Sequence, residues 1–252
     1  NAMDAGTLYV LGGRKEAKKL KSELTYKLVN GQYVGDSKTD YIYNGTGRID
    51  RIEHFGYRSH QQVLLMADQF EYRDGRVYQI NRFDAQKGGI LRSTNFQYDN
   101  QGKVVAMEQT EGGVTTKAKV TYHYGINPGA QVQYTYSNTT VTTNYYLAFG
   151  NGNVTSGSSV SSNDNTATGQ YEYDTEINPY AHMGWPDLFF SRFSRNNLKA
   201  QQKTYYGAYP AEEPYSFKYT YDNDGYPKEL VRDYKHYFST ERLYTTKTVY
   251  TY

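Results

Sequence analysis

A short aromatic pattern recurs along most of this chain and restricts its fold more than any other feature. Two aromatic residues, or an aliphatic and an aromatic residue, flank a single position and lead into a turn, and a second β-prone run follows. Because the pattern returns about every 25 residues, it predicts an array of β-hairpins. The copies are Tyr41-Ile42-Tyr43, Phe70-Glu71-Tyr72, Phe96-Gln97-Tyr98, Tyr122-His123-Tyr124, Leu147-Ala148-Phe149, Tyr171-Glu172-Tyr173 and Tyr219-Thr220-Tyr221.

The length of the repeat also predicts the architecture. About 25 residues accommodate two strands and two connections, so six to eight units give roughly 14 to 16 strands. A sheet this wide tends to close, because closure removes its exposed edges. We therefore expect an all-β fold, a large antiparallel up-and-down meander that forms a closed or nearly closed barrel of about 14 to 16 strands. Residues 247–252 alternate cleanly and could close the barrel by pairing with residues 24–29.

The chain is expected to contain a single β-repeat barrel domain over residues 22–252, preceded by an N-terminal segment at residues 1–21. Asn1-Ala2-Met3 is typical of the remnant of a cleaved purification tag. The absence of cysteine excludes disulfides and thiolate chemistry. A formal net charge of +2, with both signs interspersed, argues against nucleic acid as a partner.

One segment, residues 177–197, interrupts the repeats and holds the only tryptophan. Pro186 suits the first position of a helix, and Asp187 suits its positive end. The sequence predicts a short helix or ordered loop near residues 185–195, which caps or plugs the barrel because its apolar residues are too concentrated for water. Residues 155–168, rich in Ser, Thr, Asn and Gly, are expected to form a mobile polar loop.

No catalytic or cofactor-binding motif is recognisable in the sequence. The five histidines, at positions 54, 60, 123, 182 and 236, lack the spacing that places two imidazoles on one metal ion. Asp222-Asn223-Asp224-Gly225 fits a hairpin turn better than a calcium loop, because the positions that should supply the other carboxylates are occupied by Thr220 and Val231. We expect no catalytic residue, no metal and no cofactor.

Aromatic residues of the interrupting segment are the candidate ligand-binding residues. Tyr and Trp rings stack on sugars and dominate protein interfaces. The alternative is structural, since aromatic pairs across strands also hold a sheet together and a plug buries its rings. The candidates are Trp185, Phe189, Phe190 and Tyr180.

Part of the sequence resembles a known protein family. The similarity is carried by Asn178-Pro179, Trp185-Pro186-Asp187-Leu188-Phe189-Phe190-Ser191, Asn196-Asn197 and Tyr219-Thr220-Tyr221-Asp222-Asn223-Asp224-Gly225-Tyr226-Pro227. These runs resemble an uncharacterised family of exported Bacteroidetes lipoproteins, a domain of unknown function with a porin-like β-barrel fold. The resemblance implies such a barrel over about residues 22–252. It also implies a lipoprotein of the bacterial outer membrane, periplasmic or surface-facing, anchored through an upstream cysteine. The family has no assigned activity, so no residue role is transferred.

Together these features favour a non-catalytic envelope module that binds or scaffolds a glycan, a peptide or an envelope protein. Its membrane contact would be limited to the N-terminal lipid anchor, because a mean hydropathy of −0.85 is too polar for a lipid-facing belt. One alternative is a hydrolase acting on a polymer, which requires buried carboxylates with raised pKa values in one pocket. A further alternative is a carrier of a small apolar ligand, which requires a dry cavity behind the Trp185 segment.

Overall fold

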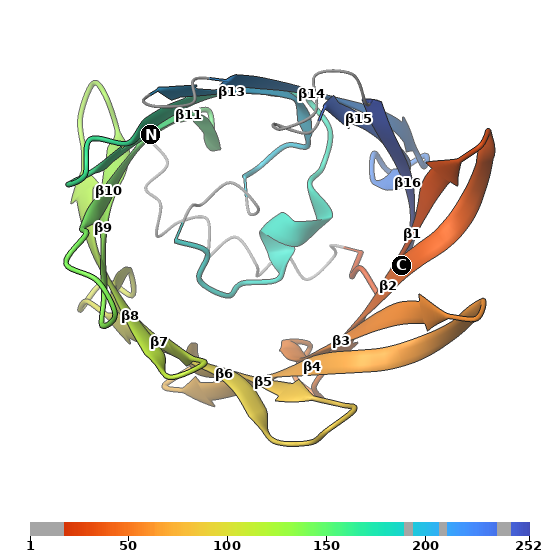
Figure 1. Ribbon diagram of the computed structural model, residues 1–252, viewed down its shortest axis with the longest axis horizontal. Helices are drawn as coiled ribbons and strands as arrows, with labels where there is room; N and C mark the ends of the chain where they lie inside the picture. The colour runs from red at the N-terminus through yellow and green to blue at the C-terminus, as the bar shows by residue number, and fades with distance from the viewer. Residues whose placement is uncertain (1–17, 189–193, 207–210, 236–242) are drawn as a thin grey trace.

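The chain folds into a closed antiparallel β-barrel. The computed structural model describes residues 18–188, 194–206, 211–235 and 243–252. Sixteen strands follow one another around the ring, each hydrogen-bonded to its neighbours in sequence, and β1 pairs with β16 (Figure 1). The prediction of a closed up-and-down barrel of about 14 to 16 strands is therefore confirmed.

The strands of the barrel and the short helix within it have the following bounds. They are β1 (Ser22–Val29), β2 (Gln32–Tyr43), β3 (Ile49–Arg58), β4 (Gln61–Arg73), β5 (Arg76–Asp84), β6 (Ile90–Tyr98), β7 (Val104–Glu111), β8 (Val114–His123), β9 (Gly129–Tyr136), β10 (Thr143–Gly150), β11 (Asn153–Ser161), β12 (Thr166–Tyr173), the 3₁₀ helix η2 (Pro179–His182), β13 (Leu198–Tyr206), β14 (Ala211–Tyr221), β15 (Pro227–Lys235) and β16 (Leu243–Thr251).

The first and last strands close the barrel, as the alternation at the C-terminal end predicts. β1 and β16 pair from Ser22 opposite Thr251 to Lys27 opposite Thr246. The hydroxyls of Thr25 and Thr248 lie 3.0 Å apart across this seam. The two outermost strands thus satisfy each other's backbone groups, as closure requires.

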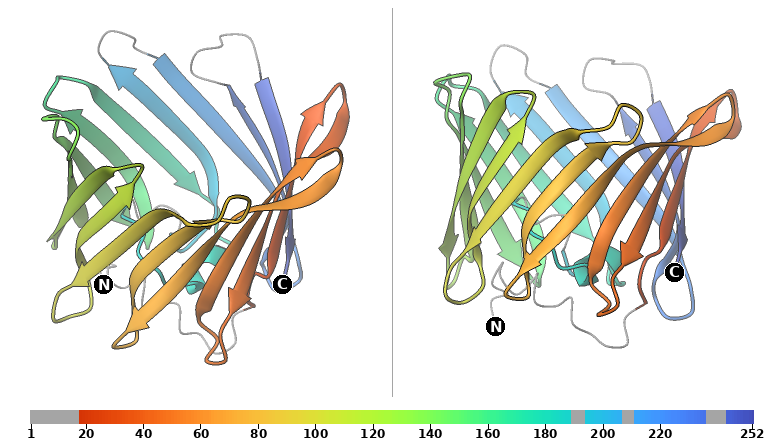
Figure 2. Two further views of the ribbon diagram at one scale, coloured as in Figure 1. Left: turned by 60° about the horizontal axis from the view of Figure 1, so that its bottom comes forward. Right: turned by 90° about the horizontal axis from the view of Figure 1, so that it is seen from below.

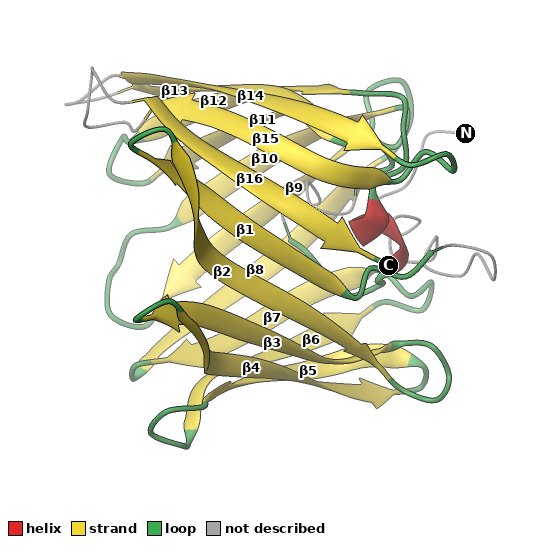
Figure 3. Ribbon diagram, turned by 90° about the vertical axis from the view of Figure 1, so that its right-hand side faces the viewer, coloured by secondary structure: helices red, strands yellow, loops and turns green. Residues whose placement is uncertain are grey.

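Tyrosine hydroxyls explain the aromatic repeat. We call the barrel end that holds η2 and the C-terminus the base (Figure 3). There, seven tyrosines each donate a hydrogen bond to a carbonyl within two residues of the start of the preceding strand, which ties the open end of one hairpin. The pairs are Tyr43 with Leu20, Tyr72 with Ile49, Tyr98 with Val77, Tyr122 with Val104, Tyr173 with Val154, Tyr219 with Leu198, and Tyr252 with Pro227.

A shift in strand register recurs beside the second residue of the repeat. In the β4–β5 pair, Glu71 lies opposite Gln79 but Tyr72 lies opposite Val77, so Tyr78 is an extra residue in β5. Such a bulge adds one residue to one strand only. The same shift occurs before Tyr43, Tyr98, Phe149, Tyr173 and Tyr221.

The hairpin turns use the residues that the sequence indicates. Asp74 and Gly75 both have positive φ, at 51° and 76°, as a tight two-residue hairpin loop demands. At Asp222 the carboxylate accepts hydrogen bonds from the backbone N–H groups of Asp224, at 2.8 Å, and Tyr226, at 3.0 Å. Lys18 pairs with both Asp222 and Asp224, at 2.9 and 2.7 Å. This segment is thus a hairpin turn, as expected, held by its own backbone and by the distant Lys18.

The prediction of a mobile polar loop at residues 155–168 is wrong. These residues belong mostly to β11 and β12, which pair from Ser156 opposite Gln170 to Val160 opposite Thr166. Small side chains are compatible with strands where larger neighbours cover them. At Gly157, an added Cβ would lie 3.2 Å from the Leu147 side chain, which occupies that space.

The interrupting segment lies within the ring at the base (Figure 2). Its described helical turn is η2, earlier than the expected position near residues 185–195; residues 184–187 have no regular structure, and residues 189–193 of the expected stretch lie outside the described part of the chain. Asn178 caps this turn by accepting a hydrogen bond from the Tyr180 N–H at 3.0 Å, and Pro179 follows at the first helical position. Asn178-Pro179 is therefore the start signal that forms a helix here, whereas Trp185-Pro186 is not.

The two faces of the barrel wall differ in polarity. Phe70 points into the lumen, because its ring packs edge-on against Trp185 of the internal segment with centroids 5.4 Å apart. Its neighbours Gln69 and Glu71 therefore face outward. By the same alternation, polar side chains form the outward face of β6, β8 and β9, namely Asn95, Gln97, Lys117, Lys119, Thr121, Gln131, Gln133 and Thr135. Among the described residues, no helix is long and apolar enough to cross a membrane.

Candidate functional site

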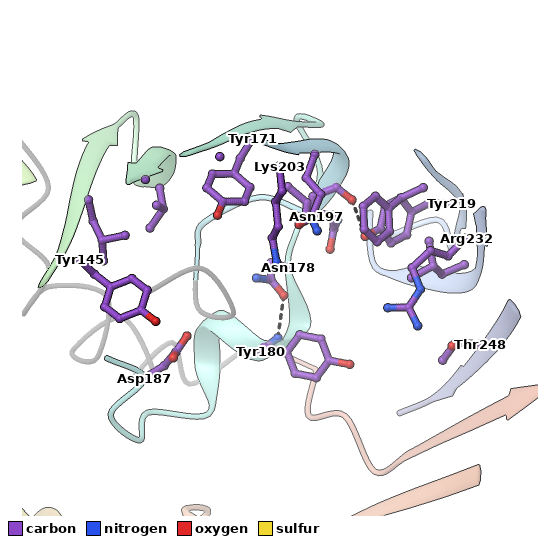
Figure 4. Close-up of a pocket in the computed structure, with 18 of the residues that line it drawn as sticks. Tyr145, Tyr171, Asn178, Tyr180, Asp187, Asn197, Lys203, Tyr219, Arg232 and Thr248 are labelled. Carbon is purple, nitrogen blue, oxygen red and sulfur yellow. Dashed lines mark hydrogen bonds between the residues drawn. The ribbon is translucent and has the colours of Figure 1, made fainter. Parts of the chain in front are cut away.

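A cavity of about 1000 Å³ occupies one side of the lumen. Its wall comes from β10 to β16 and from β1, and η2 with its flanking residues forms part of its floor (Figure 4). The internal segment therefore does not fill the barrel. The aromatic lining consists of Tyr145, Tyr171, Tyr180, Tyr205, Phe217, Tyr219 and Tyr250.

Two tyrosines on neighbouring parts of the wall direct their hydroxyls into the space. Tyr145 and Tyr171 project from β10 and β12 with their ring oxygens toward the cavity (Figure 4). Tyr145 also packs edge-on against Tyr134, with centroids 5.5 Å apart. Burial raises the pKa of both hydroxyls, so they remain neutral hydrogen-bonding groups at physiological pH.

A glycine makes room for one of these rings. The Tyr171 hydroxyl lies across Gly169, where an added Cβ would come within 2.8 Å of its oxygen. No real Cβ atom approaches so closely, so any larger residue at position 169 would displace the ring. The absence of a side chain at Gly169 therefore sets the orientation of Tyr171 in the cavity.

Asparagines fix the floor of the cavity. The amide of Asn178 donates to the carbonyl of Ser194 at 2.7 Å, and the amide of Asn197 donates to the carbonyl of Ile177 at 3.0 Å. The Asn197 backbone N–H also bonds to the Asp174 carboxylate at 3.0 Å. These contacts hold the two ends of the internal segment together beneath the cavity.

Charged side chains of both signs complete the lining. Lys203 of β13 and Arg232 of β15 supply positive charge, while Glu23 of β1 and Asp187 of the internal segment supply negative charge. In Figure 4, Lys203 extends from the wall toward the turn at Asn178. The cavity thus combines flat ring faces with hydrogen-bonding groups, an arrangement typical of sites for polar ligands with apolar faces.

The described acidic residues give no support to a metal centre. The described part of the chain contains no cluster of three or more His, Cys, Asp or Glu residues that could hold a metal ion. At Asp68, Asp84 and Asp222, hydrogen bonds to the carboxylate outweigh its burial and lower its pKa.

The sequence-based ligand candidates separate in the structure. Tyr180 lines the cavity, and its ring lies 6.4 Å from that of Tyr41. Trp185 is 7% exposed and packs in the core against Phe70, away from the cavity lining. Phe189 and Phe190 lie outside the described residues.

Sequence reasoning did not single out most of the residues that line the cavity. Tyr171 and Tyr219 belong to the aromatic repeat, but every copy of the repeat carries such rings. Lys203 and Arg232 lie on strands without any distinctive motif. The internal segment contributes Asn178, Pro179, Tyr180 and Asp187 to the lining, so its position decides which wall residues share a cavity with it.

Comparisons with known proteins show a shared fold. No family model matches the chain, and no curated protein matches it. Among solved structures, a porin-like protein from Bacteroides uniformis is similar with a TM-score of 0.57 and 13% sequence identity, covering 93% of this chain and 98% of that one. A porin-like protein from Bacteroides vulgatus has a TM-score of 0.47 at 13% identity and covers 93% and 99%. The first of these likenesses shows that the two proteins share a fold.

Proposed function

We propose that this protein is a non-catalytic binding protein that takes a glycan into the lumen of its barrel. The observation that carries the proposal is the open cavity of about 1000 Å³, in which tyrosine rings alternate with polar and charged groups. A sugar offers an apolar ring face for stacking and hydroxyls for hydrogen bonds, so both parts of this lining would be used. The neutral hydroxyls of Tyr145 and Tyr171 can both donate and accept such bonds.

The lining favours this ligand over a small apolar one. An apolar ligand would leave Lys203, Arg232, Glu23 and Asp187 in contact with hydrocarbon, and removing charged groups from water is costly. Carriage of an apolar ligand would instead require a dry cavity lined by aliphatic residues. A polar ligand can replace the water around these side chains without that cost.

The outer wall supports a barrel surrounded by water. The outward residues of β6, β8 and β9 are mainly Gln, Asn, Lys and Thr, whereas a lipid-facing wall carries an apolar band between aromatic girdles. The similarity to a Bacteroides porin-like protein favours the bacterial envelope as its location. We infer an outer membrane lipoprotein, periplasmic or surface-facing, held by an N-terminal lipid anchor.

A thermal-shift screen with neutral oligosaccharides tests the proposal. A ligand at about 100 times its dissociation constant adds about 2.7 kcal/mol to the free energy of unfolding. For a domain of this size, that gain raises the melting midpoint by several degrees. In Tyr145→Ala, the ligand should cause no rise in the melting midpoint over that of the same variant without ligand.

Tyr146→Ala provides a matched control on the adjacent position. Tyr146 faces outward and is 44% exposed, so this variant should retain the full rise. If no oligosaccharide stabilises the protein, or if the rise is unchanged in Tyr145→Ala, lumen binding is wrong.

A further inference from the structure

Five ionisable side chains form a row across the opposite wall of the lumen, one from each of five consecutive strands. His54 lies on β3, Asp68 on β4, Arg82 on β5, Arg92 on β6 and Glu111 on β7. Asp68 lies directly opposite Arg82, Arg82 opposite Arg92, and Arg92 opposite Glu111. Figure 1 shows β5 and β6 on the side of the ring away from β13 and β14, which line the aromatic cavity.

The row faces inward. Asp68 is two residues from Phe70, whose ring contacts Trp185 inside the barrel, and the two therefore share a face. Arg92 is four residues from Phe96, and Glu111 is four residues from Met107; both apolar partners belong to the buried core. The register within these stretches of strand is regular, so the alternation holds.

Asp68 neutralises only one of the two arginines. The Arg82 guanidinium donates to both carboxylate oxygens of Asp68, at 2.7 and 2.9 Å, and the His54 ring nitrogen lies 2.9 Å from the same carboxylate. Burial alone would raise the pKa of Asp68, but these hydrogen bonds hold it well below its ordinary value. Asp68 is therefore a fixed negative charge committed to Arg82 and His54.

Arg92 lacks an equivalent partner in the described part of the chain. Its half-buried guanidinium makes no hydrogen bond or ion pair with the described residues, and Glu111, although opposite it in register, forms no ion pair with it. Like charges placed directly opposite on neighbouring strands destabilise a sheet. Burial and the neighbouring Arg82 accordingly lower the pKa of Arg92. A second negative group would relieve this arrangement.

We propose that Arg92, with Arg82 beside it, is an anion-binding site on the lumen wall that takes a carboxylate, sulfate or phosphate group. The planar guanidinium presents several N–H donors in a fork that matches the paired oxygens of such groups. Arg82 lies beside it and is kept in place by its own bonds to Asp68, so Arg92 supplies the positive charge that an anion would neutralise. The site shares no residue with the lining of the aromatic cavity, so it stands independently of glycan binding there.

Titration with sodium sulfate, sodium phosphate and sodium glucuronate at constant ionic strength tests this site. Chemical shifts of the Arg92 side-chain N–H signals report binding directly, and calorimetry gives the dissociation constant. We expect saturable binding, weakened at least tenfold in Arg92→Gln. Tighter binding of glucuronate than of the inorganic anions would identify an acidic sugar as the source, and the reverse order would identify a free anion.

Two further variants separate the site from a general effect of charge. Arg51→Gln removes a positive charge from the outward face of β3, where Arg51 neighbours Glu53 at 3.6 Å, and should leave anion affinity unchanged. Glu111→Gln removes the exposed negative charge opposite Arg92 and should tighten anion binding. This variant tests the site even if Arg92→Gln fails to fold. Equal losses of anion affinity in Arg51→Gln and Arg92→Gln would overturn the proposal. The absence of a saturable shift in the Arg92 N–H signals would overturn it as well.

Discussion

The Tyr98 hydroxyl donates a hydrogen bond of 2.5 Å to the carbonyl of Val77, a residue that is 1% exposed. Val77 is the second residue of β5 and Tyr98 is the last residue of β6, so this bond closes the hairpin at the end opposite its turn. Six other tyrosines make the same contact around the base. At these seven of the thirty tyrosines the hydroxyl has a structural role, because phenylalanine would supply the ring without the donor.

Loss of one such hydroxyl should lower stability without changing the fold. Tyr98→Phe leaves the buried carbonyl of Val77 without its partner, and we expect a loss of about 1 to 2 kcal/mol in the free energy of unfolding. Urea denaturation measures this value. Tyr146→Phe removes a hydroxyl from an exposed ring and should change the free energy by less than about 0.5 kcal/mol. Equal effects in the two variants would show that the base hydrogen bonds do not stabilise the barrel.

Asp68 should make the protein sensitive to acid. Its pKa is lower in the folded state than the ordinary value near 4, so its ionised form contributes stability at neutral pH, and this contribution is lost as the pH falls below about 4. Asp68→Asn cannot take up that proton. The variant should be less stable than the parent at about pH 7, with the difference narrowing toward about pH 2.

Denaturation curves across this pH range check the expectation. Asp36→Asn alters an exposed carboxylate whose ion pair with Lys27 spans 3.8 Å, and should follow the parent closely. A constant difference between Asp68→Asn and the parent at all pH values would contradict the assignment to Asp68.

The orientation of Tyr171 should control ligand binding. Gly169→Ala places a Cβ where the Tyr171 hydroxyl lies, so the ring must turn away from its present position. We expect weaker binding of any oligosaccharide that stabilises the parent, by roughly tenfold, with little effect on anion binding at Arg92. Gly45→Ala is the control, because no atom lies within 4 Å of the added Cβ there. Calorimetric titration of both variants with the oligosaccharide and with the anion measures the two affinities. A loss of both affinities in Gly169→Ala would indicate misfolding and not a changed orientation of Tyr171.

Closure of the barrel should depend on its last strand. Deleting residues 244–252 removes the partner of both β1 and β15 and exposes two long edges. We expect aggregation or loss of cooperative melting. A truncated protein that remained monomeric and melted cooperatively would show that the β1–β16 seam is not needed.

The sequence predicts the barrel because its period and its turn residues are local signals. The step from Tyr72 to Tyr98 contains a complete hairpin, and Asp74-Gly75 identifies one of its turns without any knowledge of the rest of the fold. Closure followed from the number of repeats and from the alternation in the last residues of the chain. Each of these inferences needs only neighbours in sequence.

The arginine site on the lumen wall could not be predicted in the same way, because it depends on the register between neighbouring strands. Simple alternation from the buried Val77 would place Gln79 and Asn81 inside the barrel. The bulge at Tyr78 reverses the alternation, so that Ile80 and Arg82 face inward instead. The pairing of Arg82 with Arg92 likewise requires the cross-strand register, which contains another shift immediately beyond Arg82.

The polar stretch at residues 155–168 shows a second limit. Its composition indicates a loop, but its backbone groups pair within the barrel, and the side chains of Leu147 and Tyr171 cover its one glycine, Gly157. Tertiary contacts of this kind override local propensity. The same small residues leave space beside the wall, which is where the cavity lies.

Glycan binding in the lumen can be observed directly. The most direct test is a crystal structure of the protein with the oligosaccharide that gives the largest thermal stabilisation. We predict sugar rings between Tyr145 and Tyr171, above the turn that Asn178 caps. Sugar bound only to the outer wall, with none in the cavity, would contradict the account.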